Sequence, residues 1–471
     1  MLAGCASGND VQPSLAAYDP ASLDAGHAIA AAAQSAATNA AAPKWWAVFG
    51  DAQLDALMDA AERDAPSIQM AQARLRAASA AGAASAANLL PTIDGSASAS
   101  IDRFPGHYTY SARYADNTGS DGAIGADLRY HLDFWGKWRK AAEAAQFRRD
   151  AAGFEAADAK LVLQTSLAAA WLTLDAAYRE RDVAVQGLAR RDGVLHLLEV
   201  RRKSGLSTDI NAAVAREAAT QTRAEIARDD DRIARLRHEI AALLGKTPAF
   251  ADTLARPSLR HAADPAPLSN VPATLLGYRP DVAARRSAVE AAAKEIGVAK
   301  AAFYPDVNLV AFAGFQSLGI GYLLRASSAS ASAGPAVTLP IFEGGRLRAN
   351  LAGRVAEYDE AVGAYNATVV AALQQVADGI AAVKAARQRR QEALAAESHW
   401  AHVVELQRAR QRSGLADAND LLATETAWLV SQRRTAEIDA EVSSAQISLV
   451  RALGGAWAPA SSVISAQADH D

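Results

Sequence analysis

Two short stretches of the chain carry residue types that could support catalysis. Residues 245–247 (Gly-Lys-Thr) imitate the end of a phosphate-binding loop, and residues 238–239 (His-Glu) begin a pattern typical of zinc proteases. The first pattern requires glycine where Ile240 stands, and the second requires histidine where Ala242 stands. The chain has no GxSxG or GxGxxG sequence, and its nine histidines are scattered. We therefore expect no enzyme, no metal site and no cofactor.

A different chemistry, covalent attachment of lipid, is indicated at Cys5, the only cysteine of the chain. A single cysteine excludes disulfides within the chain and CxxC metal sites. Residues 2–5 (Leu-Ala-Gly-Cys) resemble a bacterial lipobox, and the Ala/Ser/Pro stretch that follows resembles a flexible tether. Ala6 stands where the inner-membrane retention signal of such lipoproteins places Asp, which points to the outer membrane. A free cysteine in a disordered tail is the alternative.

The composition indicates long, closely packed helices rather than one thick core. Of the 471 residues, 51% are hydrophobic, but only 6% are aromatic and much of the apolar fraction is alanine. The net charge of -4, with Arg-rich runs interleaved with Asp and Glu, excludes nucleic acid as a partner. No stretch of about 18 uncharged apolar residues occurs, which excludes a transmembrane helix. Any membrane crossing must then be made by strands.

The chain repeats one pattern twice. A shift of 209 residues brings landmark residues of the first half onto the second: Arg201 onto Arg410, Ser204–Leu206 onto Ser413–Leu415, and Leu244-Gly245 onto Leu453-Gly454. The apolar phase of the flanking helices matches as well, so both copies present the same helix face to a neighbour. We expect a lipobox and flexible tether at 1–44, the first repeat at 45–256, the second at 257–457, and a flexible tail at 458–471.

Each repeat contains two segments with the alternation of a two-faced strand. We expect these strands at about 92–102 and 123–134, and at about 306–316 and 333–342. Each is about 10 residues long, the length that a tilted strand needs to cross a membrane. Four strands cannot close a barrel, and open edges do not survive in lipid. The strand count therefore requires oligomerisation, and a trimer would supply twelve strands.

The strands lead into long helices that end at a glycine turn. No proline occurs between residues 136 and 204 or between 344 and 413, and at ~1.5 Å per residue each span would extend about 100 Å. We expect long helices at about 137–203 and 207–245, and at about 346–412 and 416–453. Such helices need partners along their length. The expected fold is thus mainly α with a β-barrel part: two tandem repeats, a long α-helical coiled-coil barrel and four transmembrane strands per chain.

The chain resembles the TolC/OprM-type outer-membrane factors, and in its N-terminal part the NodT-like efflux lipoproteins. The resemblance rests on six motifs spread over residues 45–457: WWAVFGD at 45–51, YRPDV at 278–282, AFYP at 302–305, PIFEGGR at 340–346, VADG at 376–379 and ALGG at 452–455. It implies a trimer with a 12-stranded barrel in the outer membrane and a long periplasmic helical barrel. It also implies a periplasmic tip that docks an adaptor and, through it, an inner-membrane pump.

The two glycine turns are the expected functional points, since they join the long helices at the end farthest from the strands. On the resemblance, residues of both turns would contact the adaptor: Arg201, Gly205, Leu206, Arg410, Gly414 and Leu415. The resemblance also places a pore constriction just beyond each turn, at Asp209, Asn211, Asn419 and Asp420. Three symmetry-related aspartates facing one axis would repel each other and attract cations. Structural readings stay open: glycine permits the turn between antiparallel helices, and the aspartates can serve as ordinary N-terminal acids of helices.

The function expected is a passive outer-membrane channel of a tripartite efflux system, carrying small toxic compounds or drugs. The implied partners are two further copies of the chain, a periplasmic membrane-fusion adaptor, outer-membrane lipid, and an inner-membrane pump of the RND, MFS or fusaric-acid type. The expected location is the outer membrane, with a lipid anchor and an extension into the periplasm. The alternatives are a periplasmic coiled-coil scaffold or adaptor without a pore, and an exit duct for protein secretion.

Overall fold

The computed structural model describes residues 11–19, 23, 44–107, 114–259, 279–416 and 418–455. Cys5, the expected lipidation site, and the expected tail at 458–471 lie outside these residues. The chain divides into two compact units. Unit 1 comprises Met1–Ala17, Arg74–Gly153 and Ala284–Asn366, and unit 2 comprises Tyr18–Ala73, Phe154–Ala283 and Ala367–Asp471.

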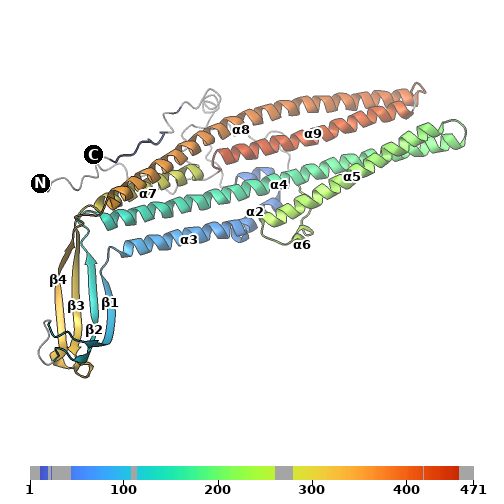
Figure 1. Cartoon of the computed structure of the whole chain (residues 1–471). Coiled ribbons are helices and arrows are strands. Elements are labelled where there is room, and N and C mark those ends of the chain that lie inside the picture. Colours follow the sequence, from blue (N-terminus) through green and yellow to red (C-terminus); the bar gives the residue numbers. More distant parts are fainter. Residues whose placement is uncertain are drawn as a thin grey trace. The chain divides into compact units, whose positions relative to one another are not determined.

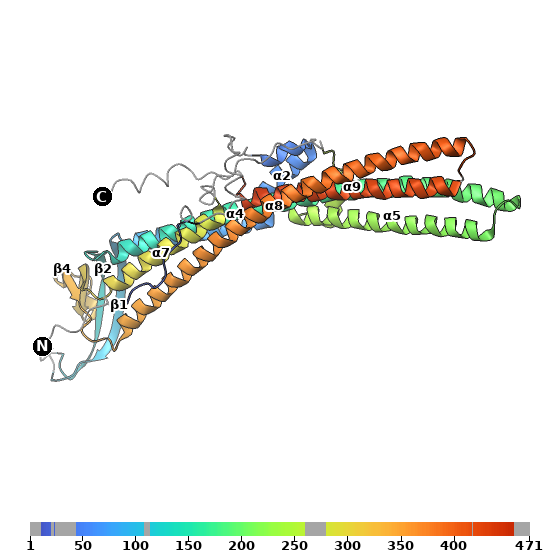
Figure 2. The same cartoon turned by 90° about the horizontal axis from the view of Figure 1, so that it is seen from above.

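The main elements follow one order in both repeats: a helix, two strands, a long helix and a returning helix (Figures 1 and 2). The first repeat contains η2 (Trp45–Phe49), α2 (Ala52–Asp64), α3 (Pro66–Ala87), β1 (Thr92–Arg103), β2 (Thr118–His131), α4 (Lys137–Lys203), α5 (Asp209–Leu243) and α6 (Pro248–Ala251). The second contains α7 (Pro280–Ala301), β3 (Asp306–Leu318), η4 (Ile320–Tyr322), η5 (Ala326–Ser328), β4 (Ala329–Thr338), α8 (Arg346–Arg412) and α9 (Ala418–Ala452). The long helices α4 and α8 have 67 residues each, and their returning partners α5 and α9 have 35 residues each. Equal lengths in equal order indicate that both repeats adopt one architecture.

The strands form one antiparallel sheet in unit 1, in the order β1-β2-β3-β4. The register places a polar row of β1 beside a polar row of β2, with Asp94 opposite Asp127 and Ser100 opposite Asp121. The neighbouring row, which includes Ile93 and Ile101 of β1, is apolar. Within the described part of the chain, β1 and β4 each pair on one side only, so the sheet has two open edges.

Two strands begin and end at different residues from those expected. β2 starts at Thr118, which pairs with Arg103, and it ends at His131 because Asp133 leaves the sheet to accept the N–H groups of Trp138 and Arg139 at the start of α4. β4 runs over residues 329–338 rather than 333–342. Its ladder with β3 stops there because Thr338 pairs with Asp306, the first residue of β3, which directly follows Pro305. Hydrogen bonding between strands, rather than alternation alone, determines these ends.

The helices that enter and leave the sheet are joined across the repeats in unit 1. Trp135, at the junction of β2 and α4, stacks on Tyr304 with ring centroids 4.5 Å apart, and its Nε1–H donates to the carbonyl of Pro305 at 3.0 Å. Tyr304 and Pro305 belong to the AFYP motif of the second repeat. This motif therefore ends α7 and also supports the first repeat.

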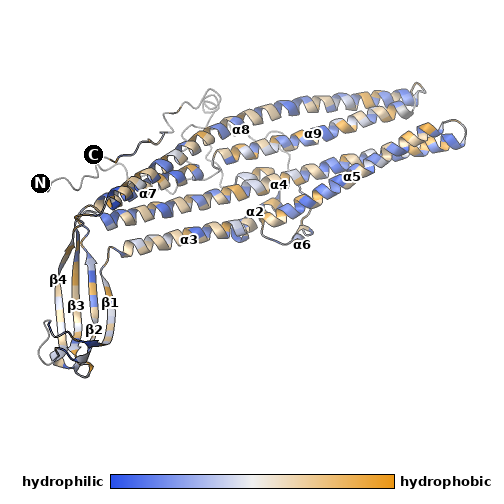
Figure 3. Cartoon of the chain, in the orientation of Figure 1, coloured by the Kyte–Doolittle hydropathy of each residue, from blue (hydrophilic) through white to orange (hydrophobic). Residues whose placement is uncertain are grey.

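The main core of unit 2 forms where the N-terminal helix α2 covers α4 and α5. Its largest buried side chains include Trp46, Leu54, Met58, Leu167, Trp171 and Ile240. Elsewhere the long helices carry polar and apolar residues in alternation along their length, as Figure 3 shows. This pattern suits helices that pack side by side as narrow pairs.

Among the helices of the described residues one, α8, is long and apolar enough to cross a membrane, by length and composition only. The sequence expectation concerned stretches without charges, whereas the apolar part of α8 is allowed up to two charged residues. A single helix of this kind is weak evidence, since core helices of soluble proteins pass the same test. Val362, Val369 and Ala372 of α8 are fully buried in the protein, which favours packing against other helices.

Part of the N-terminal segment 1–44 is held against α8 within unit 1. The carboxylate of Asp359 accepts the backbone N–H of Ser14, the hydroxyl of Ser14 and the N–H of Leu15, at 3.1, 2.6 and 3.1 Å. The side chain of Asn366 donates to the carbonyl of Ala16 at 2.9 Å. Hydrogen bonds from Ser14 lower the pKa of Asp359. Asp359 thus forms a clasp for a segment that the sequence predicted as flexible.

Asp359→Ala is expected to release this segment without unfolding the helices, because the acceptor of all three donors is lost. Limited proteolysis by chymotrypsin should then cut at Tyr18 at least several-fold faster than in the unaltered protein. Glu360→Ala, which removes the neighbouring exposed carboxylate, is the matched control and should leave the cleavage rate unchanged. Equal rates in all three proteins would show that Asp359 does not hold the segment.

Candidate functional site

The turn between α4 and α5 has the hydrogen bonds of a glycine-terminated helix end. The N–H of Leu206 donates to the carbonyl of Arg201 at 2.8 Å, and the N–H of Gly205 donates to that of Arg202 at 3.0 Å. Gly205 has a φ of +72°, in the left-handed region that side chains with a Cβ rarely adopt. An added Cβ would meet nothing within 4 Å. Backbone conformation, rather than crowding, therefore requires glycine here.

The turn between α8 and α9 repeats this geometry. The N–H of Leu415 donates to the carbonyl of Arg410 at 2.9 Å, and the N–H of Gly414 donates to that of Gln411 at 3.0 Å. Gly414 has a φ of +74°. The side chain of Arg410 also reaches the carbonyl of Leu415 at 3.5 Å. The two Ser-Gly-Leu sequences therefore form the same type of helix-ending turn.

Each turn exposes a leucine. In a helix end of this type, the residue after the glycine usually packs against an apolar side chain one turn earlier. Here that earlier residue is an arginine in both turns, and the side chains of Leu206 and Leu415 stay 77% and 70% exposed. Arginine is enriched at protein-binding surfaces, and the neighbouring leucine adds apolar area that a partner could bury.

The first turn continues into an exposed apolar stripe that sequence reasoning missed. Ile210 and Val214 follow Leu206 at intervals of four residues, and all three side chains are largely exposed. This spacing puts Ile210 and Val214 on one face of α5, and Leu206 lies in the turn just before the helix. In the second repeat a shift of 209 residues gives Asn419 and Ala423 instead of Ile210 and Val214. The apolar stripe could have been found in the sequence by comparing these equivalent positions, which are apolar and large only in the first repeat. The two turns therefore differ in surface chemistry.

The candidate constriction residues of the first repeat are engaged locally. Asp209 forms an ion pair of 3.0 Å with Arg202 across the turn. Thr208 caps α5 by accepting the N–H of Asn211 at 3.4 Å, and the amide of Asn211 donates to Ser207 at 3.5 Å. The turn thus engages Asp209 with Arg202, a residue that the sequence did not single out, and engages Asn211 separately with Ser207 and Thr208.

In the second repeat, Asp420 lies in the exposed first turn of α9, and its carbonyl accepts the hydroxyl of Thr424 at 2.8 Å. The side chain of Asn419 lies outside the described residues. Asp209 and Asp420 both complement the positive end of a helix dipole, and the basic residues that end α4 and α8 complement the negative end. In the described ranges, no group of three or more His, Cys, Asp or Glu residues could hold a metal ion.

Comparison with known proteins matches two stretches, residues 57–246 and 271–455, to the family model described as outer membrane efflux protein. The chain is 37% identical to the fusaric acid resistance protein FusA of Burkholderia cepacia over 74% of its length, and spans 66% of that protein. It is 30% identical to the multidrug resistance outer membrane protein MdtQ of Escherichia coli O6:H1, covering 97% of this chain and 96% of that one.

Among solved structures, the outer membrane protein VceC of Vibrio cholerae superposes with a TM-score of 0.81 at 33% identity, over 88% of this chain and 99% of that one. These matches confirm the resemblance to TolC/OprM-type factors and the location in the outer membrane. The chain belongs to the outer membrane efflux protein family.

Proposed function

We propose that this protein is the outer-membrane channel of a tripartite efflux system, a passive trimeric duct that carries small toxic organic compounds out of the cell. The observation that carries the proposal is the four-stranded sheet with two open edges. Backbone N–H and C=O groups at such edges cannot stay unpaired in lipid. Three copies would pair every edge and close a barrel of twelve strands.

The side chains exposed at the two helix turns support an adaptor as a partner. Both turns expose leucine beside arginine, and the first adds Ile210 and Val214. A periplasmic adaptor would bury these side chains and connect the duct to an inner-membrane pump of the fusaric-acid, RND or MFS type. Lipid on Cys5 would attach the N-terminus to the outer membrane.

The proposed function is tested with purified protein and with cells. The purified protein should run as a trimer that resists sodium dodecyl sulfate and should conduct ions in planar bilayers. In cells it should restore drug resistance to a strain from which its gene has been deleted. If the protein is a monomer in detergent and shows no conductance, the proposed function is wrong. Loss of protein secretion without loss of drug resistance on deletion would instead favour a secretion duct.

The adaptor surface is tested by Leu206→Asp combined with Leu415→Asp, which places charge where apolar contact is proposed. Drug resistance should fall to the level of the deletion strain while trimers and conductance are retained. Leu324→Asp is the matched control, because Leu324 is equally exposed but follows η4 beside the strands. Full resistance in the double variant would remove the two leucines from the adaptor contact.

Asp420→Ala is expected to raise single-channel conductance, because three aspartates around one axis would narrow and polarise the periplasmic end of the duct. Planar-bilayer recordings measure this directly. Glu392→Ala is the control, because Glu392 is exposed on α8 well before the turn that leads to Asp420. This variant should leave conductance unchanged. Equal conductance in the Asp420 variant and the unaltered protein would place Asp420 outside the constriction.

A further inference from the structure

The four-stranded sheet has an apolar face that is exposed in this chain. Ile93 lies opposite Leu128, and Val307 lies opposite Val337, on the face of the sheet that also carries Ile101. The side chains of Ile93, Ile101 and Val337 are largely exposed. In the proposed duct this face meets lipid. It therefore defines the side of the sheet on which a membrane would lie.

Large apolar side chains continue past the strands, at the end of the sheet where all four strands meet helices (Figure 1). At this end α3 leads into β1, β2 into α4, α7 into β3 and β4 into α8. Exposed apolar side chains from three of these junctions form what we name the apolar collar: Leu90, Phe134, Leu339, Ile341 and Phe342. Phe342 and Ile341 are 89% and 81% exposed. The apolar collar thus prolongs the apolar surface of the sheet toward the helices.

Cations follow the apolar collar directly, in the first turns of α4 and α8. Residues 133–142 and 341–349 contain five cations and two acids, a net charge of +3 per chain. Both acids already have partners within the chain. Asp133 accepts the N–H groups of Trp138 and Arg139, and Glu343 pairs with Arg346 at 2.6 Å. Arg346 stays 67% exposed in that pair, so its charge is available to a further partner.

The α4 cations next to the apolar collar are turned away from the polar face of the sheet. Trp138 packs on His131, which stands on that polar face, with ring centroids 4.8 Å apart. At about 100° per residue around a helix, Arg139 and Lys140 point to other sides of α4. The ammonium group of Lys140 donates to the carbonyl of Trp135 at 3.5 Å, and the side chain of Trp135 is itself exposed. Arg139 and Lys140 therefore lie beside the apolar collar.

The position of these cations opposes their own helices. The first turn of a helix favours acids, because its backbone N–H groups carry partial positive charge. The first turns of α5 and α9 contain Asp209 and Asp420, whereas those of α4 and α8 contain no acid. We name the cations beside the apolar collar the basic collar: Arg139, Lys140, Arg346 and Arg348. An anion from outside the chain would offset their unfavourable position.

We propose that the two collars bind the headgroup phosphates of anionic phospholipids, in the membrane leaflet that faces the helices. The inference rests on the proposed duct function, because it needs the strands to lie in lipid. Apolar side chains followed by cations match the order of acyl chains and phosphates in a leaflet. The long stems of Arg139 and Arg346 can lie beside acyl chains while their guanidinium groups reach the phosphates.

An anionic lipid fits the collars better than a neutral lipid or a free phosphate ion does. A zwitterionic headgroup brings its own cation, which the excess positive charge of the basic collar repels. A free phosphate ion leaves the side chains of the apolar collar in water. A lipid with net negative charge satisfies both collars.

Arg139→Gln combined with Arg346→Gln tests the basic collar, in trimers reconstituted into phosphatidylcholine vesicles that contain brominated phosphatidylglycerol. Bromine on the acyl chains quenches the fluorescence of nearby tryptophans. Trp135 and Trp138 are the tryptophans of unit 1, and both lie next to the basic collar. The unaltered protein should prefer phosphatidylglycerol to brominated phosphatidylcholine about ten-fold, and the double variant should show almost no preference.

Arg285→Gln combined with Arg286→Gln is the matched control. It removes the same charge from exposed positions of α7. At ~1.5 Å per residue, these positions lie about 22 Å before the end of α7 that meets β3. The control variant should keep the preference for phosphatidylglycerol. Equal quenching by both lipids in the unaltered protein, or equal loss of preference in both double variants, would overturn the proposal.

Two further measurements separate charge from shape and lipid from free phosphate. Arg139→Lys combined with Arg346→Lys keeps both charges and should keep most of the preference, and its loss there would contradict recognition by charge. If the glutamine double variant does not assemble, Arg139→Gln alone replaces it and should lower the preference about three-fold. Soluble glycerol phosphate should leave the quenching unchanged. If it abolishes the preference, the collars bind free phosphate and the lipid proposal is wrong.

Failure of the lipid proposal and failure of the duct give different results. If the unaltered protein forms conducting trimers that do not distinguish the two lipids, the lipid proposal is wrong and the duct stands. If the unaltered protein forms neither trimers nor channels, the proposed function itself is wrong.

Discussion

Arg279→Ala is expected to lower the free energy of unfolding by about 3–5 kcal/mol, the range for breaking a buried ion pair on one side. Arg279 is 6% exposed and has acceptors from three parts of unit 2. Its guanidinium donates to Asp281 at 3.0 and 2.7 Å, to the carbonyl of Ala452 at 2.9 Å and to Gln375 at 2.9 Å. It therefore joins the start of α7 to α8 and to the last turn of α9.

The loss of stability arises because alanine leaves the partners of Arg279 without their donor. Burial pushes the pKa of Asp281 upward, but the hydrogen bonds and charge of Arg279 outweigh it, so that the pKa lies below the usual value of an aspartate. A lowered pKa in the folded state contributes stability that is present above the unfolded value and is lost as pH falls through the folded value. Without Arg279, the carboxylate of Asp281 and the carbonyl of Ala452 lose their buried donor.

Guanidinium denaturation in detergent micelles, followed by circular dichroism, measures this effect. The difference between the variant and the unaltered protein should be largest near neutral pH and should shrink below about pH 4, as Asp281 takes up a proton first in the unfolded chain and, at lower pH, in the folded one. Arg286→Ala, an exposed arginine of α7, is the control and should change stability by less than about 0.5 kcal/mol. A difference that stays constant with pH would mean that Asp281 is not the group that Arg279 stabilises.

The long helices were predictable because their ends carry strong local signals. α4 spans Lys137–Lys203 and α8 spans Arg346–Arg412, the ranges expected from the proline-free spans and the glycine turns. A glycine with positive φ ends a helix whatever its tertiary surroundings. Helix ends of this kind therefore need no knowledge of the packing.

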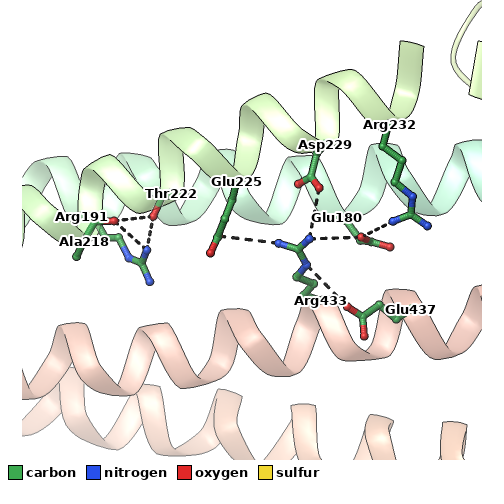
Figure 4. Close-up of polar contacts among 9 residues, drawn as sticks. All are labelled: Glu180, Arg191, Ala218, Thr222, Glu225, Asp229, Arg232, Arg433 and Glu437. Atoms are coloured by element: carbon green, nitrogen blue, oxygen red, sulfur yellow. Dashed lines mark hydrogen bonds and ion pairs between the residues drawn. The ribbon is translucent and has the colours of Figure 1, made fainter. Parts of the chain in front are cut away.

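The strand ends and the charged contacts were less accessible to sequence reasoning. The Gly and Ser residues at the start of β2 show no clear alternation of polar and apolar side chains. The strand nevertheless begins at Thr118, because Thr118 pairs with Arg103 of β1. Arg433 of α9 pairs with Glu180 of α4 and Asp229 of α5, which lie about 200 to 250 residues earlier in the chain (Figure 4). No local sequence pattern determines how these helices are rotated about their axes. For the turns, leucine and arginine could be named, but the pairing of Arg202 with Asp209 depended on the path of the loop.

Asp51→Ala is expected to cost about 3 kcal/mol, because one buried carboxylate serves four donors. Its Oδ1 accepts the N–H groups of Gln53 and Leu54 at 2.8 and 3.1 Å, which caps α2. Its Oδ2 accepts the indole N–H of Trp171 at 3.1 Å and the N–H of Ser258 at 2.7 Å. Asp51 thus joins the WWAVFGD motif to α4 and to the chain that follows α6.

The expected cost has two parts that a second substitution separates. Loss of the cap costs about 1 kcal/mol, and a buried N–H left without an acceptor costs about 1–3 kcal/mol. Asp51→Asn keeps one carbonyl oxygen, so it can serve either the cap or Trp171 and Ser258, and it should show about half the effect. Trp171 is fully buried, so a red shift of its fluorescence should accompany the loss of its partner.

Asp64→Ala is the matched control, because Asp64 ends the same helix and its side chain makes an exposed ion pair of 3.4 Å with Lys246. Exposed pairs contribute about 0–1 kcal/mol, so this variant should unfold close to the unaltered protein. If Asp51→Ala and Asp64→Ala unfolded alike, the carboxylate of Asp51 would contribute no more to stability than an exposed ion pair. A larger loss for Asp51→Ala, reduced by half in Asp51→Asn, would instead assign it the joining of α2 to the long helices.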